Sequence, residues 1–348
     1  MPLRKADHIA QVLRGEILSG QRGPGARLPT YDALVEQLGV TRPTVARALK
    51  GLRREGLLTV DGTRGVFVAR TFPHNNRYLW VTSEQPDGPE WTSLLANMLD
   101  VIERRETGIA EEIIPLVGVD GRANNPAYQT LCEAVERRSV AGLLLMSSAT
   151  IGLLPALEAP GLPRVAISAP LPGAALVTLD VWALIEIACA RLLERGRRIA
   201  VFSPHAPYLE RAQHILLGRG LDRPLLTTVH TAPVGCQKIT ELLFERPDRP
   251  DAVFVTNDSL VAPLLAGLAR AKLQPRRDVH VIAHCNWPRP IGSGQGVEHI
   301  GLDVRELLRA AKECIDAQRA GEACPGRVIP PRAPDSRTTS WPGLSCAA

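Results

Sequence analysis

The segment LGVTRPTVARALKGL, residues 38–52, decides the fold of the N-terminal region. We expect Gly39 to end a helix that begins after Thr30, whose side chain can cap the first turn. A second cap, Thr41, follows almost at once. Pro43 is compatible with the first turn of the next helix, because the N–H that it lacks has no helical acceptor there. Two helices joined by such a tight turn predict a helix-turn-helix.

The second helix of this pair, expected over residues 42–55, has one apolar and one cationic face. The apolar face contains Val45, Ala48, Leu49 and Leu52. A helix with a packed face and a cationic face suits insertion into the major groove of DNA from its N-terminal end. A solvated basic helix in a structural domain is the alternative. We predict that DNA is contacted by Thr41, Arg42, Thr44, Arg47 and Lys50.

The charges of the chain are unevenly distributed. The net charge is +5, and residues 1–70 hold 12 Lys and Arg against 6 Asp and Glu, which leaves 29 against 30 for the remainder. All of the positive excess therefore lies in the N-terminal region. This asymmetry is typical of a nucleic-acid-binding module joined to a neutral domain.

A β-hairpin is predicted directly after the second helix. Residues 57–60 and 66–68 are rich in strand-forming side chains, and Asp61 with Gly62 supplies the turn between them. Such a hairpin forms the wing of a winged helix-turn-helix, and an Arg at its tip can enter the minor groove or hold a phosphate. We predict that the tip contacts DNA through Thr63, Arg64 and Gly65.

Residues 6–68 resemble, in order, the DNA-binding domain of GntR-family (gluconate-repressor type) regulators. The similarity runs through Ile17–Gly20, Pro24–Pro29, Leu38–Leu49, Leu52, Glu55–Leu58 and Gly62–Val68. The resemblance implies a dimeric repressor, and a dimer with two such heads would bind a near-palindromic operator. It places at the DNA Arg42, Thr44, Arg47 and Gly65. The chain departs from the family at Asp32, where an Arg is common, so Asp32 is not a predicted contact.

Beyond a predicted linker at residues 71–76, strand-like and helix-like segments alternate. The strand-like segments lie at residues 78–83, 113–117, 142–146, 164–168, 176–179, 199–202, 225–229, 252–256 and 279–283. Alternating strands and helices imply parallel sheets with helices on both faces. Because these strands are too many for one sheet, we predict an α/β domain of two lobes, with ligand at the carboxyl ends of strands.

Residues 77–340 resemble, more loosely, the effector domain of LacI-type (lactose-repressor) regulators, which is itself similar to periplasmic sugar-binding proteins. The resemblance runs through Gly142–Leu145, Pro163, Val177–Asp180, Leu192–Ala200, Arg211, Pro250–Asp258 and Arg327–Thr338. It implies a two-lobed domain, residues 77–348, that dimerises and binds a small polar effector between its lobes. A sugar or sugar derivative is expected, and its binding would change the affinity for DNA.

The same resemblance supplies candidate effector contacts. The guanidinium of Arg211 suits vicinal hydroxyls or a carboxylate, and Asn257 and Asp258 can bond hydroxyls at the end of a strand. The alternatives are a surface ion pair for Arg211 and a helix cap for Asp258.

Two further stretches bear on the effector. After the strand at 279–283 the family usually offers an acidic residue, whereas this chain has His284–Trp287. Here Asn286 can still bond a hydroxyl, and Trp287 can stack on a pyranose ring. Trp91 is a second stacking candidate, although a buried Trp is more common.

Motifs for other chemistry are weak. Residues 292–296 are Gly-rich, but no strand leads into them and no Lys follows, so we expect no phosphate loop. His280, His284 and Cys285 could suggest zinc, yet such residues on an apolar strand usually pack in the core. Seven scattered cysteines indicate reduced thiols. We therefore expect neither catalysis, nor a cofactor, nor a metal.

The expected location is the cytoplasm. The apolar runs are too short to span a membrane, and the first residues lack a signal-peptide core. Two other interpretations stay open. One is a cytoplasmic small-molecule-binding protein or enzyme. The other is a regulator whose C-terminal domain has lost ligand binding and serves only for dimerisation.

Overall fold

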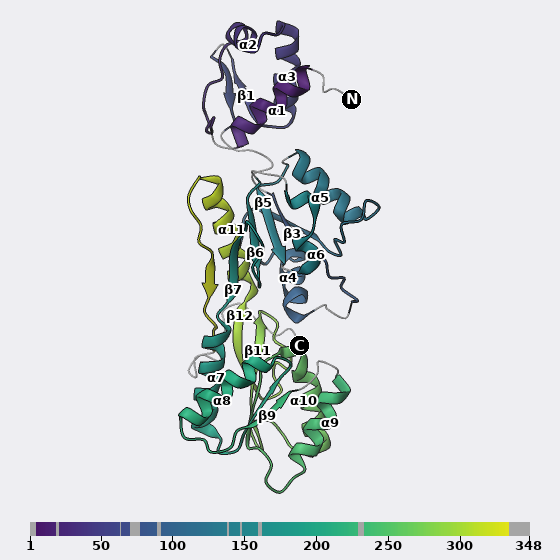
Figure 1. Cartoon of the computed structure of the whole chain (residues 1–348), viewed down its shortest axis with the longest axis vertical. Helices are drawn as coiled ribbons and strands as arrows, with labels where there is room; N and C mark the ends of the chain where they lie inside the picture. The colour runs from purple at the N-terminus through teal and green to yellow at the C-terminus, as the bar shows by residue number, and fades with distance from the viewer. Residues whose placement is uncertain are drawn as a thin grey trace. The chain divides into compact units, whose positions relative to one another are not determined.

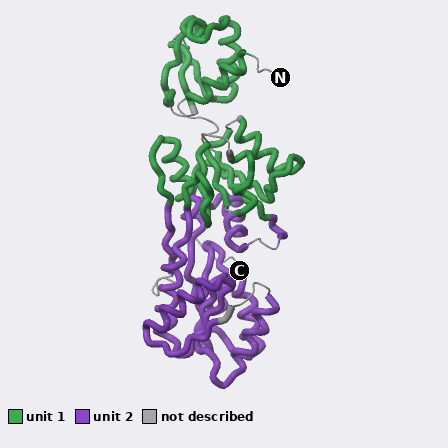
Figure 2. Tube along the Cα trace, in the orientation of Figure 1, with its two compact units in different colours: residues 1–84, 109–176, 310–326 green, residues 85–108, 177–309, 327–348 purple. Residues whose placement is uncertain are grey.

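The computed structural model describes residues 5–18, 21–62, 64–69, 77–88, 92–137, 139–146, 148–158, 162–228 and 233–333. The chain divides into two compact units, each built from separate segments (Figure 2). Unit 1 comprises residues 1–84, 109–176 and 310–326, and unit 2 comprises residues 85–108, 177–309 and 327–348. Within the described ranges, no helix combines the length and apolar character that a membrane span requires.

The N-terminal region of unit 1 folds as three helices and a hairpin (Figure 1). The helices are α1 (Lys5–Leu18), α2 (Tyr31–Leu38) and α3 (Arg42–Arg54), and β1 (Leu58–Asp61) pairs antiparallel with β2 (Gly65–Val68). The predicted helix-turn-helix and its wing are therefore present. All five elements contribute to one apolar core, which includes Ile9, Leu13, Leu34, Val45, Leu49, Leu58 and Val66.

The turn between α2 and α3 uses the predicted residues, with one difference. Thr30 Oγ1 accepts a hydrogen bond from the N–H of Ala33 at 3.3 Å, and Gly39 ends α2 at φ +60°. Thr41 has the extended backbone of an N-cap, but its side chain makes no capping bond. Its hydroxyl instead lies 2.9 Å from the hydroxyl of Thr44. The side-chain cap predicted for Thr41 is therefore wrong, because the Thr41 hydroxyl bonds the Thr44 hydroxyl and not a backbone N–H.

A six-stranded sheet follows in the order β13-β7-β6-β5-β3-β4. Its strands are β3 (Arg77–Val81), β4 (Glu112–Leu116), β5 (Gly142–Met146), β6 (Arg164–Ile167), β7 (Ala175–Leu179) and β13 (Arg327–Ile329). The ladders β3–β4, β3–β5, β5–β6 and β7–β13 are parallel. This is the predicted arrangement, because parallel neighbours need a crossover connection between them.

Helices cover both faces of the strands in unit 1. Leu79 and Leu143 pack with Leu131 of α5 (Pro126–Arg137). Tyr78 points to the opposite face, because successive side chains of a strand alternate. Its hydroxyl donates a hydrogen bond to Asp316 of α11 (Val304–Arg319) at 2.8 Å. Two short helices, α6 (Ala149–Gly152) and η2 (Pro155–Glu158), complete this part.

Unit 2 is built on a five-stranded sheet in the order β12-β11-β10-β8-β9. Its strands are β8 (Ile199–Ser203), β9 (Leu225–Thr228), β10 (Ala252–Val255), β11 (His280–Trp287) and β12 (Val297–Asp303), and every ladder is parallel. The sequence predicted β11 too short and did not predict β12. Both strands contain polar residues at their ends, so a search for apolar runs does not detect their full length.

Alternate residues of β10 face two helical layers. Phe254 packs in one cluster with α7 (Val181–Arg195) and α8 (Ala206–Gly218). Val253 and Val255 pack in another with α9 (Pro233–Phe244) and α10 (Val261–Arg270). One further helix, α4 (Ser93–Glu103), also belongs to unit 2, and η3 (Asp258–Leu260) follows β10. The sheet is therefore buried on both faces, which leaves its strand ends for polar groups.

The pairing of β11 with β12 requires a glycine. Gly301 lies opposite Cys285, and a Cβ atom added to Gly301 would stand 1.8 Å from the carbonyl oxygen of Cys285. That atom is backbone in the middle of a ladder, so it cannot move aside without breaking the pairing.

We expect Gly301→Ala to destabilise unit 2 by about 1–3 kcal/mol or more, because the added methyl group forces the two strands apart. The control is Gly235→Ala in α9, where an added Cβ meets nothing within 4 Å. That change should leave stability unchanged or raise it by about 0.4–1 kcal/mol. Urea unfolding of the full chain measures both, and equal midpoints for the two variants would contradict the prediction.

Candidate functional site

The third helix of the N-terminal region presents a polar face to solvent. Four of its polar residues are exposed, namely Thr41, Arg42, Arg47 and Lys50, and Thr44 is half-buried. The opposite face is buried and consists of Val45, Ala48, Leu49 and Leu52. Among the described residues, no acidic side chain forms an ion pair with Arg47 or Lys50. Unpaired cations on such a helix face can meet phosphates or base edges without first breaking another contact.

The N-terminal end of α3 carries a small charged cluster. The Nη1 atom of Arg42 lies 3.6 Å from Oδ1 of Asp32, and its Cζ atom lies 6.0 Å from the centre of the Tyr31 ring. Both partners are on α2. The first cation of α3 is thus positioned by the preceding helix.

The tip of the wing holds two arginines. Arg64 is exposed, with its Nη1 atom 3.5 Å from Oδ2 of Asp61. Gly65 has φ +118°, and an added Cβ would stand 3.4 Å from Nε of Arg27. Arg27 pairs with Phe67 of β2 through an isolated bridge, so its guanidinium lies against the tip. The sequence assigned no role to Arg27, because a bridge to β2 from outside the hairpin has no local signature. Thr63 lies outside the described residues.

A buried polar cluster lies where β10 and β11 end in unit 2. Oδ2 of Asp258 accepts hydrogen bonds from the hydroxyl of Ser93 and from Nδ2 of Asn286, the latter at 2.8 Å. Nδ2 of Asn286 also donates to Oγ of Ser93 at 3.0 Å. Asp258 is 4% exposed and Asn286 is 2% exposed. The structure therefore brings these two predicted residues into direct contact.

This cluster has hydrogen-bonding capacity to spare. Oδ1 of Asn286 and Nε2 of His284 are buried without a hydrogen-bond partner in the described part of the chain. No Lys, Arg or His of that part forms an ion pair with Asp258. Burial lowers the pKa of His284, against the opposing effect of the Asp258 charge, so the ring is neutral near pH 7. A buried carboxylate and a free amide oxygen favour a ligand that donates hydrogen bonds.

The neighbouring predicted residues have structural partners. Oδ1 of Asn257 accepts hydrogen bonds from the N–H of Ser259 at 3.0 Å and from its hydroxyl at 2.7 Å, so Asn257 rather than Asp258 caps η3. Trp287 is half-buried and meets the ring of His299 edge-on, with the ring centres 6.2 Å apart. Trp91 lies outside the described residues.

Arg211 lies on α8 and forms an ion pair with Glu186 of α7. Its side chain is 39% exposed. This contact is the surface ion pair that the sequence left as the alternative to a ligand contact. The role of Arg211 in effector binding stays a prediction.

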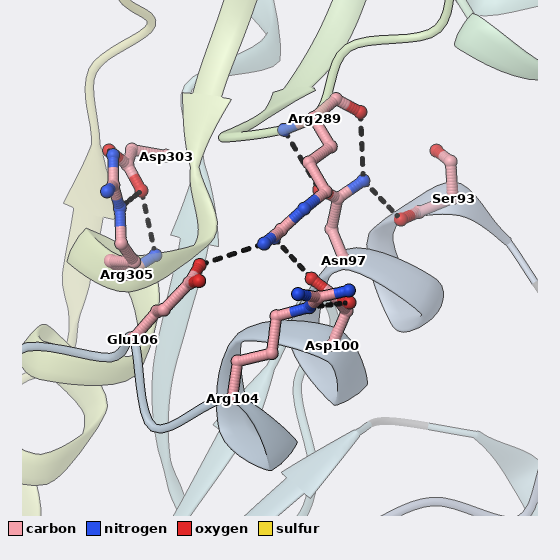
Figure 3. Close-up of polar contacts among 8 residues, drawn as sticks. All are labelled: Ser93, Asn97, Asp100, Arg104, Glu106, Arg289, Asp303 and Arg305. Carbon is pink, nitrogen blue, oxygen red and sulfur yellow. Dashed lines mark hydrogen bonds and ion pairs between the residues drawn. The ribbon is translucent and has the colours of Figure 1, made fainter. Parts of the chain in front are cut away.

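Arg289 fastens α4 to the segment after β11, a feature that the sequence did not reveal (Figure 3). Its guanidinium pairs with Asp100 and, at 2.9 Å, with Glu106. Oδ1 of Asn97 accepts a hydrogen bond from the backbone N–H of Arg289 at 3.2 Å, and Nδ2 of Asn97 donates one to the backbone carbonyl oxygen of Arg289 at 3.4 Å. These contacts hold the helix whose first residue, Ser93, bonds Asp258.

Metal ligands are not gathered in the described ranges, where no three His, Cys, Asp or Glu residues are placed around a common point. His280, considered above for zinc, lies with its Nε2 atom 3.2 Å from Oε2 of Glu298. Arg191 pairs with the same carboxylate. The His280 contact, together with the Arg191 pairing, lowers the pKa of Glu298 to about 2.

Comparison with known proteins identifies the N-terminal domain. Residues 5–68 match the family model of bacterial regulatory proteins, gntR family. The chain is 40% identical over 65 residues to the HTH-type transcriptional regulator Rv1152 of Mycobacterium tuberculosis, and 41% identical over 61 residues to the histidine utilization repressor of Pseudomonas aeruginosa. Each match covers 18% of this chain, and they span 54% and 24% of the two relatives. Residues 5–68 are a GntR-family helix-turn-helix domain.

Solved structures identify the fold of the larger part. A LacI-family regulator from Rhizobium etli has a TM-score of 0.58 at 16% identity, over 74% of this chain and 97% of its own. One from Chloroflexus aggregans has a TM-score of 0.57 at 18% identity, over 74% and 95%. A third, from Enterococcus faecium and with bound ribose, has a TM-score of 0.53 at 17% identity, over 74% and 96%. The predicted LacI-type, periplasmic-binding-protein-like fold is confirmed, and at these identities the likeness concerns the fold alone.

Two histidines of unit 2, His299 and the half-buried His284, predict a loss of stability in acid. Burial holds the pKa of His284, and also that of His299, below the ordinary 6.5. The unfolded chain therefore takes up protons first as the pH falls below 6.5, and the folded state loses stability until the folded pKa is reached. Above 6.5 neither form is protonated and the effect is absent.

We expect His284→Asn to lose less stability than the wild type between pH 7.5 and pH 5.5, by up to about 1.4 kcal/mol. Urea unfolding at the two pH values measures the difference, which does not depend on the absolute stability of the variant. The exposed His214 provides the control, since His214→Asn should lose as much as the wild type. An identical pH dependence for His284→Asn would disprove the assignment.

Proposed function

We propose that this chain is a DNA-binding transcription regulator whose affinity for its operator is controlled by a small-molecule effector. Residues 1–70 would be the DNA-binding domain, residues 71–76 a linker, and residues 77–348 the effector-binding and dimerisation domain. The observation that carries the proposal is the cationic face of α3, where Arg47 and Lys50 have no acidic partner among the described residues, within a GntR-family helix-turn-helix domain. The location that fits this function is the cytoplasm.

DNA binding would use α3 in the major groove and the wing beside it. Arg42, Thr44 and Arg47 lie at the end of the helix that enters the groove, and Arg64 extends from the wing tip. We propose a homodimer whose two heads are separated by about one turn of DNA, roughly 34–36 Å, on a near-palindromic operator. Repression relieved by the effector is the working direction, which the repressor name of the Pseudomonas aeruginosa relative supports.

Effector binding would use the cluster of Asp258 and Asn286. The hydroxyl of Ser93 already bonds both side chains, and a ligand hydroxyl can make the same bonds. Together with the ribose in the Enterococcus faecium structure, this supports a sugar or sugar derivative as the effector. The effector can change DNA affinity only by its differential affinity for two states, typically about 1–3 kcal/mol.

A second candidate is a regulator whose C-terminal domain only dimerises. It is supported by Arg211, whose guanidinium is engaged by Glu186, and by the residues that depart from the family at His284–Trp287. Neither candidate requires catalysis.

Replacing Arg47 tests the DNA-binding role. Arg47→Ala should weaken binding to a duplex enriched by the wild type from a random pool, by about 1–3 kcal/mol if Arg47 contacts a base. Arg53→Ala is the matched control, because it removes the same charge from the C-terminal turn of α3. Gel-shift titrations measure both variants. Unchanged affinity for Arg47→Ala, or an equal loss for Arg53→Ala, would rule out the role.

Replacing Asp258 tests the effector site. The full chain is screened by thermal shift against monosaccharides, sugar acids and sugar phosphates. A ligand at a hundred times its dissociation constant adds about 2.7 kcal/mol, enough to raise the melting temperature by several degrees. Asp258→Asn should abolish the shift, whereas Asp248→Asn, an exposed control in the same unit, should keep it.

The outcomes separate the candidates. Loss of the shift in Arg211→Ala as well would add that residue to the effector site. A shift that survives Asp258→Asn would place the effector elsewhere. No shift with any compound would favour the dimerisation-only candidate and would leave the DNA-binding proposal standing.

A further inference from the structure

The pairing of Asp32 with Arg42 has no part in the function proposed above. Asp32 lies in the first turn of α2, and its Oδ1 atom is 3.6 Å from Nη1 of Arg42, the first residue of α3. The ring of Tyr31, also on α2, has its centre 6.0 Å from Cζ of the same guanidinium. The helix before the recognition helix therefore supplies a carboxylate and an aromatic ring to the first cation of the DNA-facing surface.

Stability does not account for this arrangement. The side chains of Arg42 and Asp32 are 68% and 81% exposed, and ion pairs so exposed contribute little to folding. A separation of 3.6 Å is longer than a hydrogen bond. Asp32 thus attracts the guanidinium without occupying its N–H donors, which stay available to another partner.

A carboxylate at this position changes what Arg42 can bind. Phosphates are fully charged, and Asp32 repels them, so the pair as a whole presents almost no net charge to the DNA backbone. The edge of a guanine carries no net charge and offers two acceptors that match the guanidinium fork. Asp32 therefore weakens a contact of Arg42 with phosphate more than it weakens a contact with a base.

We propose that Asp32 is a specificity-determining residue of the DNA interface. Its carboxylate keeps Arg42 from binding phosphates of any sequence and directs the guanidinium to a base edge, with guanine as the matching chemistry. This inference rests on the proposed DNA binding and adds to it a residue that opposes non-specific binding. Asp32 acts through Arg42 and makes no contact with DNA of its own.

The test compares two duplexes bound by the full chain. One is a duplex enriched by the wild type from a random pool, and the other is a shuffled duplex of the same composition. Asp32→Asn removes the charge and keeps the shape, and Asp32→Glu restores the charge. The matched control is Glu36→Gln, which removes the same charge from the next turn of α2, at an exposed position without an ion pair to Arg42 in the described part. Fluorescence anisotropy over a series of KCl concentrations gives each affinity.

We expect Asp32→Asn to bind the shuffled duplex more tightly. The slope of log affinity against log salt should steepen by about 0.9 for each additional phosphate that the variant neutralises. The ratio of enriched to shuffled affinity should fall roughly fivefold or more, and Asp32→Glu should retain most of the wild-type ratio. Glu36→Gln should leave the ratio unchanged.

Two results would overturn the inference while leaving DNA binding intact. One is an enriched-to-shuffled affinity ratio in Asp32→Asn that equals the wild-type ratio. The other is a fall of this ratio in Glu36→Gln as large as that in Asp32→Asn, which would show that the effect comes from net charge alone. If the wild type enriches no sequence at all, the proposed function fails and the inference fails with it.

Discussion

The parallel register of β10 and β11 is the constraint on which the polar site of unit 2 depends. Val255 and Ala283 lie opposite each other in the ladder, and Asp258 and Asn286 each follow them by three positions. Parallel strands end at the same edge of a sheet, so the two side chains reach the same height and meet. A shift of register by one residue would send one of them to the other face. Ser93 completes the cluster by bonding both side chains.

The two proposed binding regions, α3 and the polar cluster of unit 2, differ in whether their cations form ion pairs. In unit 2, Arg289 is neutralised by Asp100 and Glu106, and Arg305 is neutralised by Asp303 (Figure 3). On α3 the cations Arg47 and Lys50 have no acidic partner among the described residues. One surface therefore suits a polyanion, and the other presents a buried carboxylate that suits neutral or cationic donors. This difference follows from pairing rather than from the number of charged residues.

The N-terminal domain could be predicted almost completely, because its signals are local. The cap at Thr30, the glycine at 39 and the apolar face of α3 all act within a few residues of one another. The contacts of Ser93 with Asp258 and of Asn97 with Arg289 join residues far apart in the chain, and no periodicity announces them. Asn257 and Asp258 were predicted as polar residues at the end of a strand, but only the structure shows that the first caps η3 and the second bonds Asn286.

The order of segments in the two units has a consequence for synthesis on the ribosome. The core of the helix-turn-helix domain is contained in residues 9–69, so that domain can fold as soon as this stretch has emerged. Unit 1 as a whole takes its last segment, with most of α11, from residues 310–326. The sheet face that carries Tyr78 therefore stays without its partner Asp316 of α11 until nearly all of unit 2 has been translated. The nascent chain can thus carry a folded helix-turn-helix domain long before the sheet of its own unit is closed.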